Sequence, residues 1–193
     1  MSKLSVIQLY KENYNCIGSC LRTPSVKVLP NEFNQEWLKT LIFDMFETLY
    51  AYPSGVGLAA NQVGFLKQIC VVDIKKDGKK PIALINPVYS PINKELVESK
   101  EVCLSFPQVS SCVKRYQKIK ITFFDFWGNE QTIEAEGFKS FVFQHEIDHL
   151  NGIVHIDLNS NPEGLDFYPG NSSKMANIAL QNIMNSGEKQ NGK

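Results

Sequence analysis

The sequence predicts an α+β fold: antiparallel β-sheets packed around a central metal-binding helix, with an N-terminal amphipathic helix and a short C-terminal helix. Three observations carry this prediction. Short runs of β-branched and aromatic residues are separated by turn residues, as in antiparallel strands. The segment from Phe138 to Leu150 is apolar nearly all round, as in a helix buried at the centre of a domain. With 193 residues, of which 43% are hydrophobic, the chain is long enough for one such core.

The first expected element is an amphipathic helix within residues 31–52. Its apolar residues recur at helical spacing: Phe33, Trp37, Leu41, Met45, Phe46 and Leu49. Asn31 or Asn34 would cap its start, and Pro53-Ser54-Gly55 would end it. The apolar stripe is therefore expected to be core.

The next expected elements are strands. Gln68 to Ile74 and Pro81 to Asn86 are β-branched runs separated by Asp77-Gly78, which predicts a hairpin of buried strands. Leu96 to Glu101 is expected to continue that sheet.

A second hairpin is expected immediately before the central helix. Lys118 to Phe126 alternates apolar and polar residues, Trp127-Gly128-Asn129 would turn, and Gln131 to Glu136 would return antiparallel. After Ile156 the composition shifts to Asn, Ser, Gly and Pro, with a short helix expected at about residues 174–185. Residues 1–160 are expected to form one domain, and residues 161–193 an extension, part helical with a frayed end.

Composition and charge exclude several classes of partner. The 20 basic and 20 acidic residues cancel and form no basic cluster, so neither nucleic acid nor a membrane surface is an expected partner. Neither a signal peptide nor a membrane span is recognisable, so a cytoplasmic protein is expected. The cysteines are odd in number and irregularly spaced, which favours reduced thiols: Cys16, Cys20, Cys70, Cys103 and Cys112.

The central helix carries the strongest chemical signal. His145 and His149 would lie one turn apart on one face, where two imidazoles can bind one metal ion. Glu146, on the same turn, is placed to take a proton from water. The alternative is a buried helix with two hydrogen-bonded histidines, but His-Glu-x-x-His in a chain with only three histidines favours the metal site. Phe138, Phe141 and Val142 would extend the ligand face as an apolar wall that receives an apolar side chain.

Two further segments have an ordinary interpretation when each is taken alone. Gly55 to Gln62 is typical of a tightly packed turn, although its glycines would also let a ligand approach the backbone, and the Gln62 amide could donate to a substrate oxygen. Cys103, among strand-like residues before Pro107, would more often be a small buried hydrophobe.

Together, three segments resemble the signature motifs of the peptide deformylases. The family patterns are glycine-x-glycine-x-alanine-alanine-x-glutamine, glutamate-glycine-cysteine-leucine-serine and glutamine-histidine-glutamate-x-aspartate-histidine. They match residues 55–62, 101–105 and 144–149, in this order, and the resemblance extends from about Thr23 to Leu158. One position departs, because Val102 stands where the family usually has glycine.

The resemblance implies a set of roles. The metal ligands would be Cys103, His145 and His149. Glu146 would be the general acid and base, and Gln62 with the backbone N–H of Leu104 would stabilise an oxyanion. The residues expected against the substrate are Val56, Gly57, Val102, Phe138, Phe141 and Val142. Glu101 and Arg115 would form an ion pair that braces the cysteine segment.

The implied activity is removal of the N-formyl group from the N-terminal formylmethionine of newly made peptides, with release of formate. The implied cofactor is one divalent metal ion, with Fe²⁺ favoured and Zn²⁺, Ni²⁺ or Co²⁺ as substitutes. The implied partners are N-formyl-methionyl peptides, met at the ribosome.

Two alternatives remain open on the sequence. His145-Glu146-x-x-His149-x-x-Gly152-x-x-His155 also satisfies the metzincin protease pattern, with His155 as third ligand. That pattern leaves residues 55–62 and 101–105 without a role. The second alternative is a noncatalytic relative in which Val102 has weakened or abolished turnover.

Overall fold

The computed structural model describes residues 2–8, 19–74 and 80–167. Its two α-helices are α1 (Glu36–Tyr50) and α2 (Phe138–Leu150). Its strands are β1 (Gly57–Ala59), β2 (Ile69–Val72), β3 (Ile82–Pro91), β4 (Leu96–Cys103), β5 (Phe106–Tyr116), β6 (Lys118–Phe124), β7 (Glu130–Glu136) and β8 (Asp166–Phe167). Short 3-10 turns are η2 (Cys20–Arg22), η3 (Pro30–Glu32), η4 (Ala60–Val63) and η5 (His155–Leu158).

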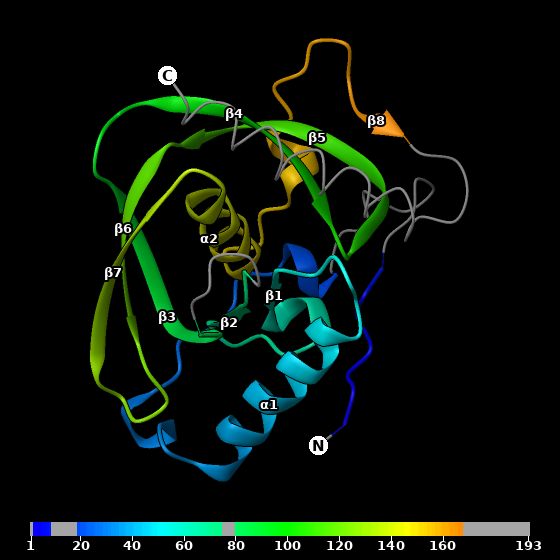
Figure 1. Ribbon diagram of the computed structural model, residues 1–193. Helices are drawn as coiled ribbons and strands as arrows, with labels where there is room; N and C mark the ends of the chain where they lie inside the picture. Colours follow the sequence, from blue (N-terminus) through cyan, green and yellow to red (C-terminus); the bar gives the residue numbers. More distant parts are fainter. Residues whose placement is uncertain (1, 9–18, 75–79, 168–193) are drawn as a thin grey trace.

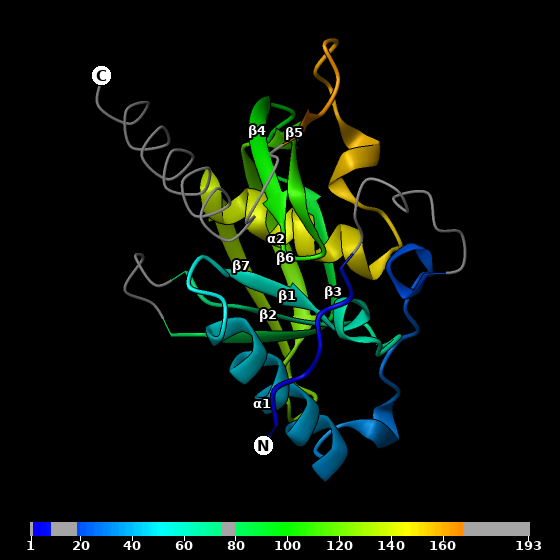
Figure 2. The same ribbon diagram turned by 90° about the vertical axis from the view of Figure 1, so that its right-hand side faces the viewer.

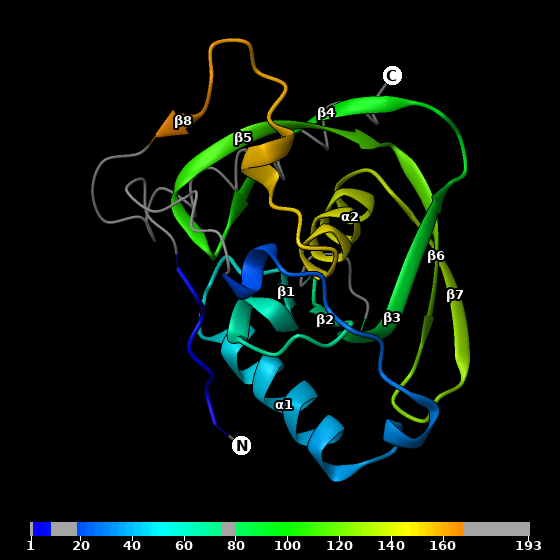
Figure 3. The same ribbon diagram turned by 180° about the vertical axis from the view of Figure 1, so that it is seen from behind.

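Two antiparallel sheets enclose the helix α2. One has five strands in the order β1-β2-β3-β6-β7, and the other has three in the order β4-β5-β8. Figure 1 shows α2 at the centre, with β4 and β5 arching over it and β1 and β2 below it. The quarter-turn view in Figure 2 and the rear view in Figure 3 show α1 on the far side of β1 and β2 from α2. The expected α+β class is confirmed, with sheets packed around a central helix.

The strand β2 explains why α1 and α2 lie on opposite faces of one sheet. Cys70 and Val72 pack in the core that contains α2, whereas Ile69 and Val71 pack in the core that contains α1. Successive side chains of a strand point to opposite faces, so a continuous apolar run is buried on both. The expected hairpin of β2 and β3 forms, with Cys70 opposite Leu84.

The helix α1 begins later than the sequence predicted. Asn34 has φ 56°, in the left-handed region, so a right-handed helix cannot run through it from Asn31. The chain instead forms η3, turns at Asn34 and begins α1 at Glu36, without a side-chain cap. The other end agrees more closely, since α1 stops at Tyr50, just before Pro53-Ser54-Gly55.

Two strand predictions need correction. The segment from Leu96 does not continue the first sheet, because β4 pairs with β5 in the second sheet. The strand β5 was not predicted at all. Its inward-facing positions include Ser111 and Arg115, each at most 3% exposed, so the apolar alternation that marks a strand is missing there. The hairpin of β6 and β7 forms as expected.

The C-terminal helix expected near residues 174–185 lies outside the described residues. Within the described part of residues 161–193, β8 pairs with β5, with Ser110 opposite Asp166. No helix among the described residues is long and apolar enough to cross a membrane.

Candidate metal centre and active site

The helix α2 is held in register by its own polar residues. Gly137, with φ 58°, precedes the helix and turns the chain out of β7. The side chain of Gln144 accepts a hydrogen bond from the Tyr116 N–H at 3.0 Å and donates to its carbonyl at 2.9 Å. At the other end, Asn61 Nδ2 donates to the His149 carbonyl at 2.5 Å. These contacts connect α2 to β5 and to the turn η4, which follows β1, and so set the positions of its histidines.

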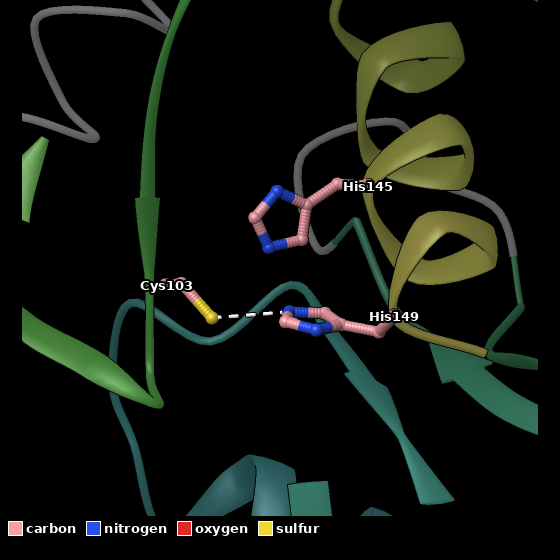
Figure 4. Close-up of side chains that lie close together, drawn as sticks. All are labelled: Cys103, His145 and His149. Carbon is pink, nitrogen blue, oxygen red and sulfur yellow. Dashed lines mark hydrogen bonds between the residues drawn. The ribbon is translucent and has the colours of Figure 1, made fainter. Parts of the chain in front are cut away.

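Three potential ligand atoms converge where β4 ends. The ligand atoms of Cys103, His145 and His149 all lie within 4.8 Å of one another. Figure 4 shows both imidazoles projecting from successive turns of α2 toward the Cys103 sulfur, and His149 Nε2 lies 3.2 Å from that sulfur. The register shift between Val102 and Cys103 breaks the ladder at the point where the thiol reaches the helix.

One ring nitrogen of His145, Nδ1, is hydrogen-bonded to a carboxylate. His145 Nδ1 donates to Glu101 Oε2 at 2.9 Å, which leaves Nε2 as the ring nitrogen that can bind a metal ion. Arg115 holds Glu101 from the other side, with Nε to Oε1 at 2.7 Å and Nη2 to Oε2 at 2.9 Å, and also donates to Asp148. Burial opposes the charge of Glu101, but the hydrogen bonds from Arg115 and His145 outweigh it and hold the carboxyl pKa well below its usual range.

The donor set fits a catalytic metal ion. A thiolate and two imidazoles leave a fourth tetrahedral position open, as in catalytic rather than structural sites. Burial lowers the pKa of His149, so its imidazole is neutral, as a ligand must be. The buried His149 Nδ1 has no hydrogen-bond partner among the described residues.

Glu146 faces the pocket next to this cluster. Its side chain is only 4% exposed, and Oε2 has no hydrogen-bond partner among the described residues. Burial raises the pKa of Glu146 to about 7, with an opposing effect from His145 and a small further rise from Glu101. A carboxyl with such a pKa can accept and return a proton near neutral pH.

The expected oxyanion donors are neighbours of Cys103. Gln62 Nε2 is 3.1 Å from Ser105 Oγ and 3.4 Å from the Cys103 sulfur, while the Ala59 N–H donates to Gln62 Oε1 at 2.8 Å. Because that backbone contact occupies Oε1, the amide nitrogen of Gln62 faces the cluster. Leu104 follows Cys103 directly.

A pocket of about 260 Å³ opens in front of these groups. It is lined by nearly every residue that the sequence predicted for the site, namely Val56, Gly57, Gln62, Val102, Cys103, Leu104, Phe138, Phe141, Val142, His145 and Glu146. His149 does not line it and lies buried behind, with 1% of its surface exposed. The structure therefore brings the three motif segments together around one cavity.

Val102 occupies its position without backbone strain. The described non-glycine residues with positive φ are Asn34 and Asn86, so valine at 102 does not replace an obligatory left-handed glycine. This removes the backbone argument for a noncatalytic protein.

The ring of His155 lies next to that of His145, with centroids 5.7 Å apart, but no nitrogen of His155 belongs to the group of three ligand atoms. Its Nδ1 lies 2.6 Å from Ser111 Oγ, and its ring packs edge-on against Phe106 with centroids 5.5 Å apart. Burial lowers the pKa of His155 to about 3, so the ring is neutral. The protease pattern would need a His155 nitrogen as the third ligand atom, whereas in this structure the Cys103 sulfur completes the group with His145 and His149.

Three residues of the site were missed by the sequence reasoning. Ser105 donates its N–H toward the Cys103 sulfur at 3.4 Å, and Gln8 Nε2 donates to the Leu104 carbonyl at 3.3 Å. Asp148 completes the charged cluster around Arg115. The position of Asp148 one residue before His149 was a usable signal, whereas nothing near Gln8 in the sequence links it to residues almost a hundred positions away.

The Glu101–Arg115 pair gives a first testable prediction. Replacing Arg115 by alanine leaves Glu101 and Asp148 buried without their cation, which costs about 3–5 kcal/mol in comparable buried pairs. In a double-mutant cycle with Glu101→Ala, measured by urea unfolding, we expect the two changes to couple strongly. Additive free energies of unfolding would show that the pair does not brace the Cys103 strand.

Comparison with known proteins agrees with this geometry. Residues 10–163 match the family described as polypeptide deformylase. The peptide deformylase of Brachyspira hyodysenteriae is 49% identical over 123 residues, which cover 61% of this chain and 65% of that relative. That of Saccharophagus degradans is 44% identical over 124 residues, covering 64% and 72%.

Solved structures agree as well. The crystal structure of peptide deformylase from Thermotoga maritima matches with a TM-score of 0.72 and 35% identity, covering 83% of this chain and all of the other. The actinonin-bound class I type b enzyme from Acinetobacter baumannii matches with a TM-score of 0.73 and 28% identity, covering 83% and 100%. The match extends over most of the chain and includes all three motif segments, so the chain belongs to the polypeptide deformylase family of metal-dependent hydrolases.

Proposed function

We propose that this protein removes the N-formyl group from the N-terminal formylmethionine of peptides and releases formate. The observation that carries the proposal is the convergence of Cys103, His145 and His149 within 4.8 Å, in a chain of the deformylase family. Glu146 lines the pocket in front of them. Neither the protease nor the noncatalytic alternative is favoured.

Each side chain has a defined task in this proposal. Cys103, His145 and His149 would hold one divalent metal ion, which supplies Lewis-acid chemistry by acidifying water and polarising a carbonyl oxygen. Glu146 accepts a proton from the attacking water and returns it to the leaving amine. Glu101, held by Arg115, keeps His145 oriented through Nδ1.

The oxyanion that develops on the formyl oxygen needs donors that are already in place. Gln62 Nε2 and the Leu104 N–H are our candidates. Gln62 is 2% exposed and its carbonyl oxygen is bonded to the Ala59 N–H, so its amide has little freedom to turn away.

The substrate class is supported by the pocket and by a relative. Phe138, Phe141 and Val142 lie along one side of α2 and line the pocket, where an apolar side chain of methionine size would fit. The Acinetobacter baumannii enzyme has also been solved with Met-Ala-Ser bound, at a TM-score of 0.72 to this chain. A peptide that begins with methionine is the product the proposed reaction would leave.

Formate release from formyl-Met and formyl-Ala peptides of otherwise equal sequence tests this function. Burying a methionine side chain is worth about 1.5–3 kcal/mol, so we expect kcat/KM to favour formyl-Met by at least tenfold. Formate would be measured with a coupled dehydrogenase on metal-loaded protein. Equal rates on both peptides would contradict an apolar pocket for the first side chain, and no formate from either would contradict the proposed function.

We infer Fe²⁺ as the working metal from the resemblance to deformylases. The mixed thiolate and imidazole set suits several ions, so Zn²⁺, Ni²⁺ or Co²⁺ could substitute. The peptides would be met as they leave the ribosome. Residues 1–160 would form the catalytic domain, and residues 161–193 an extension to it.

A further inference from the structure

Gly57 has no conformational reason to be glycine. It lies in β1, where it pairs with Val72, and it is not among the described glycines with positive φ. In an extended strand glycine is normally disfavoured, because it costs backbone entropy and packs nothing. The remaining physical reason for glycine in a strand is the close approach of another group.

That group is the side chain of Glu146. A Cβ atom built on Gly57 would lie 2.3 Å from Glu146 Oε1, 2.7 Å from Cδ and 2.8 Å from Cγ. All three distances are far below ordinary van der Waals contact, so the whole outer half of the Glu146 side chain would have to move. The glutamate therefore rests directly on the backbone of β1.

Few positions are open to a displaced Glu146. The residue is 4% exposed and belongs to a helix that is anchored by Gln144 and Asn61. Cys70, on the neighbouring strand β2, is fully buried, and its thiol pKa is raised by burial and by the negative charge of Glu146. The carboxylate would have to move further into the pocket that Glu146 lines, which changes its position relative to the ligand atoms.

We propose that Gly57 is a positioning residue for the reaction: the absence of its side chain creates the space that sets where the Glu146 carboxylate lies. This rests on the proposed function insofar as Glu146 is the general base. It differs from a role of Gly57 in contacting the substrate, because the group that needs the space belongs to the protein itself.

A stability cycle tests the steric part without any assay of activity. Gly57→Ala is expected to lower the Tm by about 2–10 °C when residue 146 is glutamate, because it overpacks a buried contact. In the Glu146→Ala background the same change should cost little, since the space is then vacant. If Gly57→Ala alone does not fold, the double variant should recover folding. An equal loss of Tm in both backgrounds overturns the proposal.

The kinetics of Gly57→Ala test the positioning part. We expect this change to lower kcat by about 10²-fold, as for a misplacement of the carboxylate by about 1 Å, with KM and metal content unchanged. If alanine instead obstructed the substrate, the loss would appear in KM while kcat was kept, which would overturn the proposal.

Gly55→Ala is the matched control. A Cβ there would meet Leu49 Cδ1 at 2.8 Å and the Leu49 carbonyl at 3.0 Å, so this position is also crowded, although less tightly, and its neighbour is α1. Its effect on Tm should not depend on the residue at 146. The role of Gly57 and the proposed function can be contradicted independently. An active Glu146→Gln variant would show that Glu146 is not the general base, whereas the stability cycle would still test the contact between Gly57 and Glu146.

Discussion

Replacing Cys103 by alanine is expected to abolish stoichiometric metal binding, while His155→Ala leaves it intact. The Cys103 sulfur is one of three ligand atoms within 4.8 Å, and the remaining two imidazoles would hold a divalent ion in open coordination. Loss of a hydrogen bond that merely supports a ligand already costs about 10–100-fold in metal affinity, so loss of a ligand should cost more. Metal per chain, measured by mass spectrometry after dialysis against a defined metal concentration, gives the result directly.

The His155 variant is the control for this experiment. His155 is buried against Ser111 and Phe106, so its truncation should lower Tm through the cavity it leaves, without changing the metal stoichiometry. The reverse pattern, in which His155→Ala removes the metal and Cys103→Ala keeps it, would support the metzincin arrangement.

Glu146→Gln is expected to lower kcat by about 10²–10⁴-fold with the metal fully bound. The amide keeps the size of the carboxylate in its contact with Gly57 but cannot accept a proton from water. The metal ligands are untouched, so the metal content and the overall fold should match those of the parent protein. Initial rates of formate release at saturating formyl-Met peptide would measure the change in kcat.

Two outcomes of this experiment would contradict the role of Glu146 as general base. A Gln variant that keeps both its metal and its rate would remove Glu146 from the mechanism. A variant that loses its metal together with its rate would show that Glu146 supports the metal centre rather than the proton transfer.

The elements that were predicted from the periodicity of neighbouring residues are found in the structure. The central helix runs from Phe138 to Leu150, as its apolar composition predicted, and the β6–β7 hairpin forms as expected. The helix places His145 and His149 on successive turns because their spacing of four residues matches its period. These features depend on residues close in sequence, so periodicity alone reveals them.

Elements whose pattern depends on distant contacts were missed or misplaced. The strand β5 buries Arg115 because β4 and α2 supply its partners, and Ser111 because His155 of η5 supplies its partner, and no local pattern reports such pairings. The strand β4 was assigned to the wrong sheet for the same reason, since sheet membership depends on which strands pair rather than on the run itself.

The sequence by itself determined the chemistry that the site can offer. The types and spacing of Cys103, His145, Glu146 and His149 specify a thiolate, two imidazoles and a carboxylate, and the three motifs identify the family. Only the tertiary structure decided how these groups are held. Glu101 of β4 accepts a hydrogen bond from His145 of α2, and Arg115 of β5 holds Glu101 in place. Gly57 of β1 packs against Glu146 of α2. The physical reason is that hydrogen bonds and steric contacts act through space, so their partners are set by packing and not by separation along the chain.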